Sequence, residues 1–316
     1  MENKELSQLK QAYDDIEIPE ELAVVTLKAI ERGKRERQNV KEKRRNRWLK
    51  LVGASAAAAL VLFVISVNTM PAFAKQIEEI PVLGRLVKIL QFNQGSARGG
   101  ELQGGTDVSL ISLRQQGNSD VIMLNFTKTS EQNKAREKAT LFNVKFSEYP
   151  DTMTFSVFDA RAFSALTDLA TLKNSRYIDD AYQLITYDDT TIRFNVTFNE
   201  TVTYEVREYG DPAQVVIIIT PVSRGDEGRQ PVYSLRTASH PFGSAQATAE
   251  EALFDWENVR ILKDREGEYF VEVGYYASED EAHRMLQKLK EQGRTSEEWY
   301  VEQREYMQLP KMIPAT

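Results

Sequence analysis

The chain has 316 residues, a formal net charge of −7 and no cysteine. The absence of cysteine excludes thiolate metal sites, thiol nucleophiles and disulfides. Only two histidines occur, His240 and His283, and we find no zinc-protease, P-loop, dinucleotide-binding or serine-hydrolase motif. The acidic balance also argues against nucleic-acid binding. We therefore expect no catalytic activity, no cofactor and no bound metal.

Residues 1–48 predict a cytosolic helical arm that ends in a basic tether. Two apolar stripes repeat at helical spacing, and Pro19 suits the first turn of the second helix. A segment this short buries too little surface to fold alone, so the stripes predict docking on a partner protein. A solvated tail beside the membrane remains the alternative. The candidate partner-binding residues are Leu6, Leu9, Tyr13, Leu22, Val25 and Ile30.

Residues 49–70 predict a single transmembrane helix. Residues 51–67 are 17 uncharged apolar or small residues, and with their flanks they reach the roughly 20 residues that cross about 30 Å of hydrocarbon. Residues 31–50 contain ten Lys or Arg against three acidic residues. The positive-inside rule therefore places the N-terminus in the cytoplasm and the C-terminus outside the membrane. A cleaved secretory precursor and a buried soluble helix are the alternatives.

The next two segments predict a connection between this span and the rest of the chain. Residues 71–92 have an apolar stripe at helical spacing, which indicates a juxtamembrane amphipathic helix. Residues 93–106 include five glycines among fourteen residues, which indicates a flexible linker with a reach of roughly 20 Å. Ala72 and Ala74 have the small side chains that signal peptidase requires, so they predict a proteolytic cleavage site.

The N-terminal segments together resemble a known family. The order "IPEEL…KAIERGK", a basic run, an apolar span and "PAFAKQIEEIPVLGRLVKILQF" is similar to the N-terminal region of membrane-anchored anti-sigma factors of Gram-positive bacteria. In that family the cytosolic arm holds an extracytoplasmic-function sigma factor. The resemblance covers residues 1–92 and implies a sigma factor as the cytosolic partner. The zinc-binding class of anti-sigma factor is excluded because cysteine is absent.

Residues 107–221 predict an extracytoplasmic β-sandwich-like domain. Short runs rich in β-branched and aromatic residues alternate with turn residues, and Asn199 and Glu200 predict a hairpin turn. The pattern "SEYPDTMTFSVFDARAF", followed by "IRFNVTF", resembles the AMIN domain, a small β-sandwich of envelope proteins. The predicted strands are 121–126, 142–146, 153–158, 192–198, 203–206 and 215–220.

After a linker at residues 222–230, residues 231–308 predict a ferredoxin-like βαββαβ domain, and residues 309–316 a tail. The stretch "YFVEVGYYASEDEAHRMLQKLKEQG" resembles the repeat of the SPOR domain, which binds peptidoglycan glycan strands without stem peptides. The first half, around "YSLRTASHPF", departs from the usual start of that domain. The predicted strands are 232–238, 259–263, 269–276 and 299–303, and the predicted helices are 245–256 and 278–292.

This second resemblance implies a glycan-binding face on the open side of the sheet. Val271 and Val273 should face the helices, which leaves aromatic rings and polar forks on the other side. Such groups suit sugar faces and hydroxyls. The alternative is a sheet face that the β-domain covers. The candidate glycan-binding residues are Arg236, Arg260, Phe270, Glu272, Tyr276 and Tyr300.

The combined prediction is an α+β protein of the cell membrane with one span. We expect an envelope sensor or regulator, similar to anti-sigma factors, that sequesters a cytosolic partner and responds to the cell wall or an extracellular ligand. The alternative is a non-catalytic, peptidoglycan-binding structural protein of the envelope whose arm is only a tether.

The predicted orientation can be tested by cysteine labelling, since the chain has no native cysteine. We expect a membrane-impermeant maleimide to label Asn199→Cys in intact cells and to leave Glu20→Cys unlabelled until the cells are permeabilised. Labelling of both positions in intact cells, or of position 20 alone, would contradict the orientation.

Overall fold

The computed structural model describes residues 85–90, 95–222, 229–293 and 298–315, with all of these residues in one compact unit, Ile80–Thr316. They form sixteen strands, one 3-10 helix and two α-helices. The expected α+β class with a transmembrane helix is therefore wrong, because this part of the chain is mostly β and none of its helices is long and apolar enough to span a bilayer. The predicted arm, the segment 49–70 and the cleavage site at Ala72 and Ala74 lie outside the described residues.

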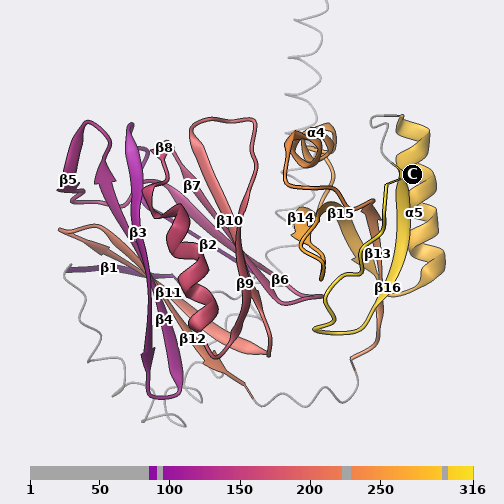
Figure 1. Ribbon diagram of the computed structural model, residues 1–316, viewed down its shortest axis with the longest axis horizontal. Coiled ribbons are helices and arrows are strands. Elements are labelled where there is room, and N and C mark those ends of the chain that lie inside the picture. Colours follow the sequence, from indigo (N-terminus) through magenta and orange to yellow (C-terminus); the bar gives the residue numbers. More distant parts are fainter. Residues whose placement is uncertain (1–84, 91–94, 223–228, 294–297, 316) are drawn as a thin grey trace, which may run out of the picture. The chain divides into compact units, whose positions relative to one another are not determined.

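The first twelve strands form two sheets that share one hydrophobic core (Figure 1). One sheet has the order β1-β11-β12-β4-β3-β8, with β5 paired to β4, and the other has the order β2-β6-β7-β10-β9. All described pairs are antiparallel except β3 with β8. The strands are β1 (Arg85–Leu90), β2 (Ser96–Gly99), β3 (Thr106–Gln116), β4 (Ser119–Lys128), β5 (Glu131–Ala135), β6 (Phe142–Ser147), β7 (Thr152–Phe158), β8 (Ala160–Ala162), β9 (Ile178–Leu184), β10 (Thr191–Phe198), β11 (Val202–Gly210) and β12 (Gln214–Pro221).

The core of this sandwich follows from the alternation of apolar and polar residues. Along β10, Phe194, Val196 and Phe198 are buried in the core, as the period of a strand requires. The ring of Phe194 stacks on that of Phe155 from the neighbouring strand β7, with centroids 4.5 Å apart and ring planes 7° apart. This pair lies at the centre of the second sheet, since β7 and β10 are both internal strands.

Strand β1 corrects the predicted amphipathic helix at residues 71–92. Residues 85–90 are a strand at the edge of the first sheet, antiparallel to β11, and the earlier part of the predicted helix lies outside the described residues. Val87 and Ile89 are β-branched residues, which favour extended backbone. Without β1, strand β11 would be the edge of the sheet and would leave its backbone N–H and C=O groups unpaired. The apolar spacing at residues 85–90 therefore belongs to a paired strand.

The glycine-rich residues 93–106 are also not a flexible linker throughout. They include β2, which pairs with β6. A Cβ atom added at Gly99 would lie 2.6 Å from the ring of Phe142, and one at Gly100 would lie 2.0 Å from the carbonyl oxygen of Thr140. Gly100 also has φ +74°, a conformation that side chains rarely adopt. These glycines permit close approach of the backbone, which composition alone does not distinguish from flexibility.

Two further differences concern connections within the sandwich. Asn199 and Glu200 do not form a hairpin turn, because β10 and β11 belong to different sheets and the turn crosses between them. Between β8 and β9 the chain forms the 3-10 helix η1 (Ser164–Asn174), which buries Ala165, Leu169 and Leu172 in the core. The sequence does not predict this helix, since the segment has only a weak apolar stripe.

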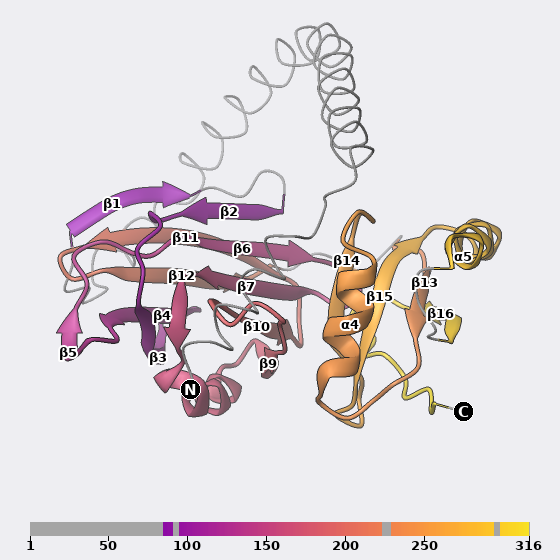
Figure 2. The same cartoon turned by 90° about the horizontal axis from the view of Figure 1, so that it is seen from above.

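The C-terminal residues form a separate four-stranded sheet with two helices on one face (Figure 2). The strands and helices follow the predicted order, and the sheet order is β14-β15-β13-β16. Helix α5 begins after Ser278, whose hydroxyl accepts a hydrogen bond from the Glu281 N–H, and ends at Gly293 with φ 58°. The elements are β13 (Val232–Thr237), α4 (Ser244–Ala252), β14 (Val259–Lys263), β15 (Tyr269–Tyr276), α5 (Glu279–Gln292) and β16 (Trp299–Arg304).

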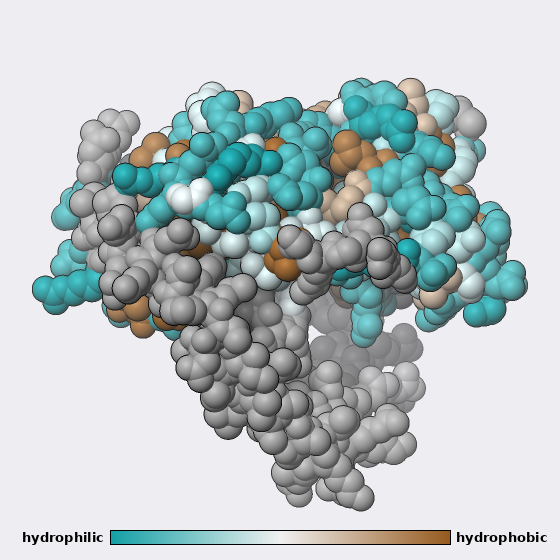
Figure 3. Space-filling view, turned by 90° about the horizontal axis from the view of Figure 1, so that it is seen from below, coloured by the Kyte–Doolittle hydropathy of each residue, from teal (hydrophilic) through white to brown (hydrophobic). Residues whose placement is uncertain are grey.

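The described surface is mainly hydrophilic on the side drawn in Figure 3, where hydrophobic residues occur only in small separate groups. Most buried apolar side chains belong to two cores, one in the sandwich and one between the C-terminal sheet and its helices, which also includes Tyr182 and Leu184 of β9. Burial of these side chains is the main contribution to the stability of both parts.

We expect Phe194→Ala to lower the free energy of unfolding by about 3–5 kcal/mol, because it removes a fully buried ring and leaves a cavity. The matched control is Phe254→Ala, since the Phe254 side chain is 83% exposed and its removal should change stability by about 0.5 kcal/mol or less. Urea denaturation followed by circular dichroism measures both. Equal effects of the two substitutions would contradict the assigned core.

Candidate functional site

The face of the C-terminal sheet opposite its helices holds five buried charged residues, which we call the charged cluster: Arg236, Arg260, Glu272, Glu302 and Arg304. Each is 7% exposed or less. They come from all four strands, since alternation places every second residue on this face. Charges this deeply buried require paired partners, so the contacts of each one determine whether the sheet can fold.

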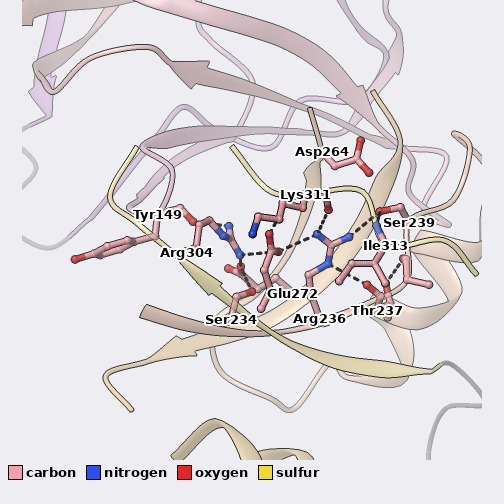
Figure 4. Close-up of polar contacts among 12 residues, drawn as sticks. Tyr149, Ser234, Arg236, Thr237, Ser239, Asp264, Glu272, Arg304, Lys311 and Ile313 are labelled. Atoms are coloured by element: carbon pink, nitrogen blue, oxygen red, sulfur yellow. Dashed lines mark hydrogen bonds and ion pairs between the residues drawn. The ribbon is translucent and has the colours of Figure 1, made fainter. Parts of the chain in front are cut away.

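Glu272 lies at the centre of the charged cluster (Figure 4). One carboxylate oxygen accepts a hydrogen bond from Arg260 Nε at 2.6 Å, and the other accepts from Arg304 Nη2 and from the hydroxyl of Ser234. Burial alone would raise the pKa of Glu272, but the charges of Arg260 and Arg304 and the hydrogen bonds outweigh it, so the pKa lies below its ordinary value. The carboxylate is therefore ionised at neutral pH.

Arg236 closes the opposite side of the charged cluster. Its guanidinium lies over the ring of Phe270, 3.4 Å from the centroid, and Nη1 donates to Glu302 at 3.0 Å and to the Lys311 carbonyl at 2.8 Å. Nη2 donates to the hydroxyl of Ser239, at 2.7 Å. The predicted tail at residues 309–316 thus supplies a backbone acceptor to a buried arginine.

The sandwich covers this face through the turn that contains Tyr149. The Tyr149 carbonyl oxygen accepts hydrogen bonds from Arg260 Nη2 at 2.8 Å and Arg304 Nη1 at 2.7 Å. Its ring contacts those of Tyr275 and Tyr306, with centroids 5.1 and 5.4 Å away. The covered face was the alternative to a glycan platform, and it is the arrangement that the structure has.

The predicted glycan-binding residues therefore lie in two different environments. Arg236, Arg260, Phe270 and Glu272 are brought together as expected, but they are buried and cannot reach an extended glycan. Tyr300 lies on the same face, opposite Arg236, and its hydroxyl donates to the Glu298 carboxylate at 2.6 Å.

Tyr276 is on the other face of the sheet, which corrects its predicted position. The pairing of β15 with β13 shifts between Glu272 and Tyr275, and Gly274 in this interval has φ +78°. This irregularity changes the phase of the strand, as a β-bulge does. Tyr275 then points to Tyr149, while Tyr276 packs against the core under the helices and its hydroxyl donates to the Val273 carbonyl.

Sequence reasoning missed Glu302, Arg304 and Tyr149. Glu302 and Arg304 are in phase with Tyr300 along β16, so alternation alone could have placed them on this face. Tyr149 contributes its backbone carbonyl oxygen, which every residue type has, so its identity in the sequence does not indicate this contact. Within the described segments no group of three or more His, Asp or Glu could hold a metal ion.

A second set of polar contacts joins the sandwich to β14 and α4. Lys263 Nζ forms an ion pair with Asp180 at 2.8 Å, and Asn195 Nδ2 donates to the Ile261 carbonyl at 2.9 Å. Arg193 binds Glu250 through both guanidinium nitrogens, at 2.6 and 2.8 Å. The two parts are therefore joined by two separate groups of directional contacts.

Two comparisons with known proteins match part of the chain. Residues 43–132 match a family described as a domain of unknown function, DUF4179. Over 90 residues, the chain is 36% identical to the anti-sigma-V factor RsiV of Bacillus subtilis strain 168. The chain contains an anti-sigma-factor-like segment. The alignment covers 28% of this chain and 28% of the relative, so the chain spans less than a third of that protein's length.

The resemblances of the later segments to the AMIN and SPOR domains gain no support from these comparisons. Neither match shows an AMIN or a SPOR domain. No solved structure matches the chain. The family match extends through β1, β2, β3 and β4, so the matched segment includes strands of both sandwich sheets and is not confined to the residues before the sandwich.

We expect Glu272→Gln to lower the free energy of unfolding at pH 7 by about 3–5 kcal/mol, because it leaves Arg260 and Arg304 buried with less compensation. Since the pKa of Glu272 is lowered in the folded protein, its contribution is present above the unfolded pKa of about 4.3 and is lost as the pH falls through the folded value. The difference between wild type and variant should therefore narrow in acid.

Urea denaturation at pH 7 and pH 3, followed by tryptophan fluorescence, measures this difference. Glu200→Gln is the control, because Glu200 is exposed on the turn after β10 and should have little effect. Equal stability of wild type and Glu272→Gln at pH 7 would contradict the role of the carboxylate.

Proposed function

We propose that this protein is an anti-sigma-factor-like regulator that sequesters a sigma factor. The observation that carries the proposal is the 36% identity over 90 residues with a protein named as an anti-sigma-V factor. The absence of cysteine from the sequence fits an anti-sigma factor that does not use thiolate-bound zinc. The regulator acts by binding and has no catalytic step.

The proposed partner-binding region is the arm around Leu6, Leu9, Tyr13, Leu22, Val25 and Ile30. The family match begins at residue 43, so this assignment is supported by the apolar stripes and not by that match. A short arm with apolar residues at helical spacing gains stability by placing them on a larger surface. A sigma factor supplies that surface in this proposal.

The proposed location is the cell membrane, with the N-terminus cytoplasmic and residues 85–315 extracytoplasmic. The excess of Lys and Arg before the apolar residues 51–67 supports this orientation. Cleavage at the site marked by Ala72 and Ala74 would separate the arm from the extracytoplasmic part, and it provides a route for release of the sigma factor.

The sandwich and the C-terminal sheet are suited to act as one body in the proposed release of the sigma factor. The charged cluster and the Tyr149 carbonyl join the C-terminal sheet to the sandwich, so a ligand on either part acts on a continuous structure. Strand β1 connects this body to the preceding residues. The alternative function, a peptidoglycan-binding structural protein, depended on an open face of the C-terminal sheet. The turn that contains Tyr149 covers that face.

The sigma-factor proposal is tested by affinity purification of the full-length chain after cross-linking in cells. We expect a sigma factor to co-purify with the wild type, and Leu22→Asp with Val25→Asp to reduce its recovery at least about tenfold, because two carboxylates would lose hydration at an apolar contact.

The control replaces exposed residues of the extracytoplasmic part, Leu102→Asp and Leu110→Asp, which are 71% and 46% exposed and should leave recovery unchanged. Comparable amounts of each variant must be present in the membrane fraction. If no sigma factor is recovered with the wild type, or if the arm variant recovers as much as the control, the proposal fails.

A further inference from the structure

A groove of about 490 Å³ lies between the second sandwich sheet and α4. One wall is the outward face of β6 and β10, and the other is α4 with the residues that follow it. Its volume is in the range of small-molecule sites. All of its lining residues belong to the described part of the chain, and eight of them bear on its chemistry: Lys145, Tyr187, Asp188, Arg193, Glu250, Glu251, Phe254 and Trp256.

Lys145 is a partly buried cation on the sandwich wall of this groove. Within the described residues it has no hydrogen-bonded or ion-paired partner. Its neighbour Arg193 is occupied by Glu250, and Arg260 is occupied by Glu272 and Tyr149. Burial, followed by the charges of Arg260 and Arg193, lowers the pKa of Lys145.

A second unsatisfied donor occurs nearby. Arg260 is 7% exposed, and its Nη1 is buried without a hydrogen-bond partner among the described residues. Arg260 does not line the groove, but its charge acts on Lys145 and favours the neutral form of the amine. A ligand with one anionic group could pair with Lys145, the cation of the groove lining that has no hydrogen-bonded carboxylate, since Arg193 is paired with Glu250.

The opposite wall carries acceptors and not further cations. Glu250 and Glu251 line it from α4, and a third carboxylate, that of Asp188, lines the groove on the sandwich side, from the loop between β9 and β10. Three carboxylates would repel a ligand with several negative charges, such as an acidic peptide. They accept hydrogen bonds from hydroxyl groups, which favours a ligand that combines one anionic group with several hydroxyl donors.

Aromatic rings flank the same groove. Phe254 is 83% exposed and Tyr187 is 55% exposed, although both are large and partly apolar. The Tyr187 hydroxyl is hydrogen-bonded to that of Thr248 on α4, and Trp256 Nε1 donates to Gln292 at 2.8 Å, so two of the rings are held in place. Flat rings at the edge of a polar groove suit the apolar face of a sugar ring.

We propose that this groove binds a sugar that carries a single carboxylate. The carboxylate pairs with Lys145, the hydroxyls donate to Glu250 and Glu251, and the sugar face lies against Phe254 or Tyr187. The site differs from the buried sheet face that the sequence predicted, and it does not depend on the sigma-factor proposal. Two sources share this chemistry, a muramic-acid residue of cell-wall glycan from which the stem peptide has been removed and a uronic acid of another polysaccharide.

The experiment is isothermal titration of the purified full-length chain with two matched pairs of sugars. N-acetylmuramic acid is compared with N-acetylglucosamine, and glucuronic acid with glucose, since each pair differs by the carboxylate. We expect the wild type to prefer the carboxylated member at least about tenfold, which is the size of one charge-assisted hydrogen bond. Tighter binding of N-acetylmuramic acid identifies the wall as the source, and tighter binding of glucuronic acid identifies a uronic-acid polymer.

Four variants locate the binding site. Lys145→Gln should abolish the preference for the carboxylated sugar, whereas Lys145→Arg should keep it. Phe254→Ala should weaken both members of a pair by a similar factor. Lys134→Gln, a lysine that is 59% exposed on β5, is the control and should change nothing.

Thermal unfolding of each variant should match the wild type, because Lys145 has no described partner to lose and Phe254 is exposed. The proposal is overturned if the wild type binds none of the sugars or if Lys145→Gln keeps the preference. It is also overturned if a short peptide with two glutamates and a phenylalanine binds more tightly than every sugar in a manner that requires Lys145.

Discussion

The described structure depends on the carboxylate of Glu272, which is buried between Arg260 and Arg304. Each arginine is shared, because it also donates to the carbonyl oxygen of Tyr149 in the sandwich. Removing any one of these groups would leave a buried charge with less compensation in a low-dielectric environment. The carboxylate of Glu272 and one terminal nitrogen of each arginine therefore keep their partners only while the sandwich covers this face of the C-terminal sheet.

Arg260 connects this interface to the proposed sugar site. Arg260 satisfies Glu272 and Tyr149 with two of its nitrogens, and its charge acts on Lys145. Arg260 and Arg193 disfavour the charged form of Lys145 and Glu250 favours it, so the charge of Lys145 depends on arginines that also join the two parts. Binding of an anion at Lys145 and stability of the charged cluster should be coupled through this side chain.

Periodicity predicted the C-terminal part well, because strands and helices there have strong alternation and clear ends. Val271 and Val273 face the helices as expected. What alternation could not predict was the irregularity near Gly274, which moved Tyr276 to the other face. Gly99 and Gly100 were misinterpreted for a related reason, since composition does not separate a glycine that permits close backbone approach from one that provides flexibility.

The least predictable contribution was that of β1. Its residues belong to the segment that resembles anti-sigma factors, yet they pair with β11, far along the chain. Leu86, Val87 and Ile89 are 51%, 60% and 45% exposed, and Leu90 is buried. Backbone pairing and one buried side chain therefore hold this edge strand, which is a weaker attachment than that of the central strands. Strand β1 is the first described segment of the chain, so the chain enters this sheet at the edge where it is easiest to open.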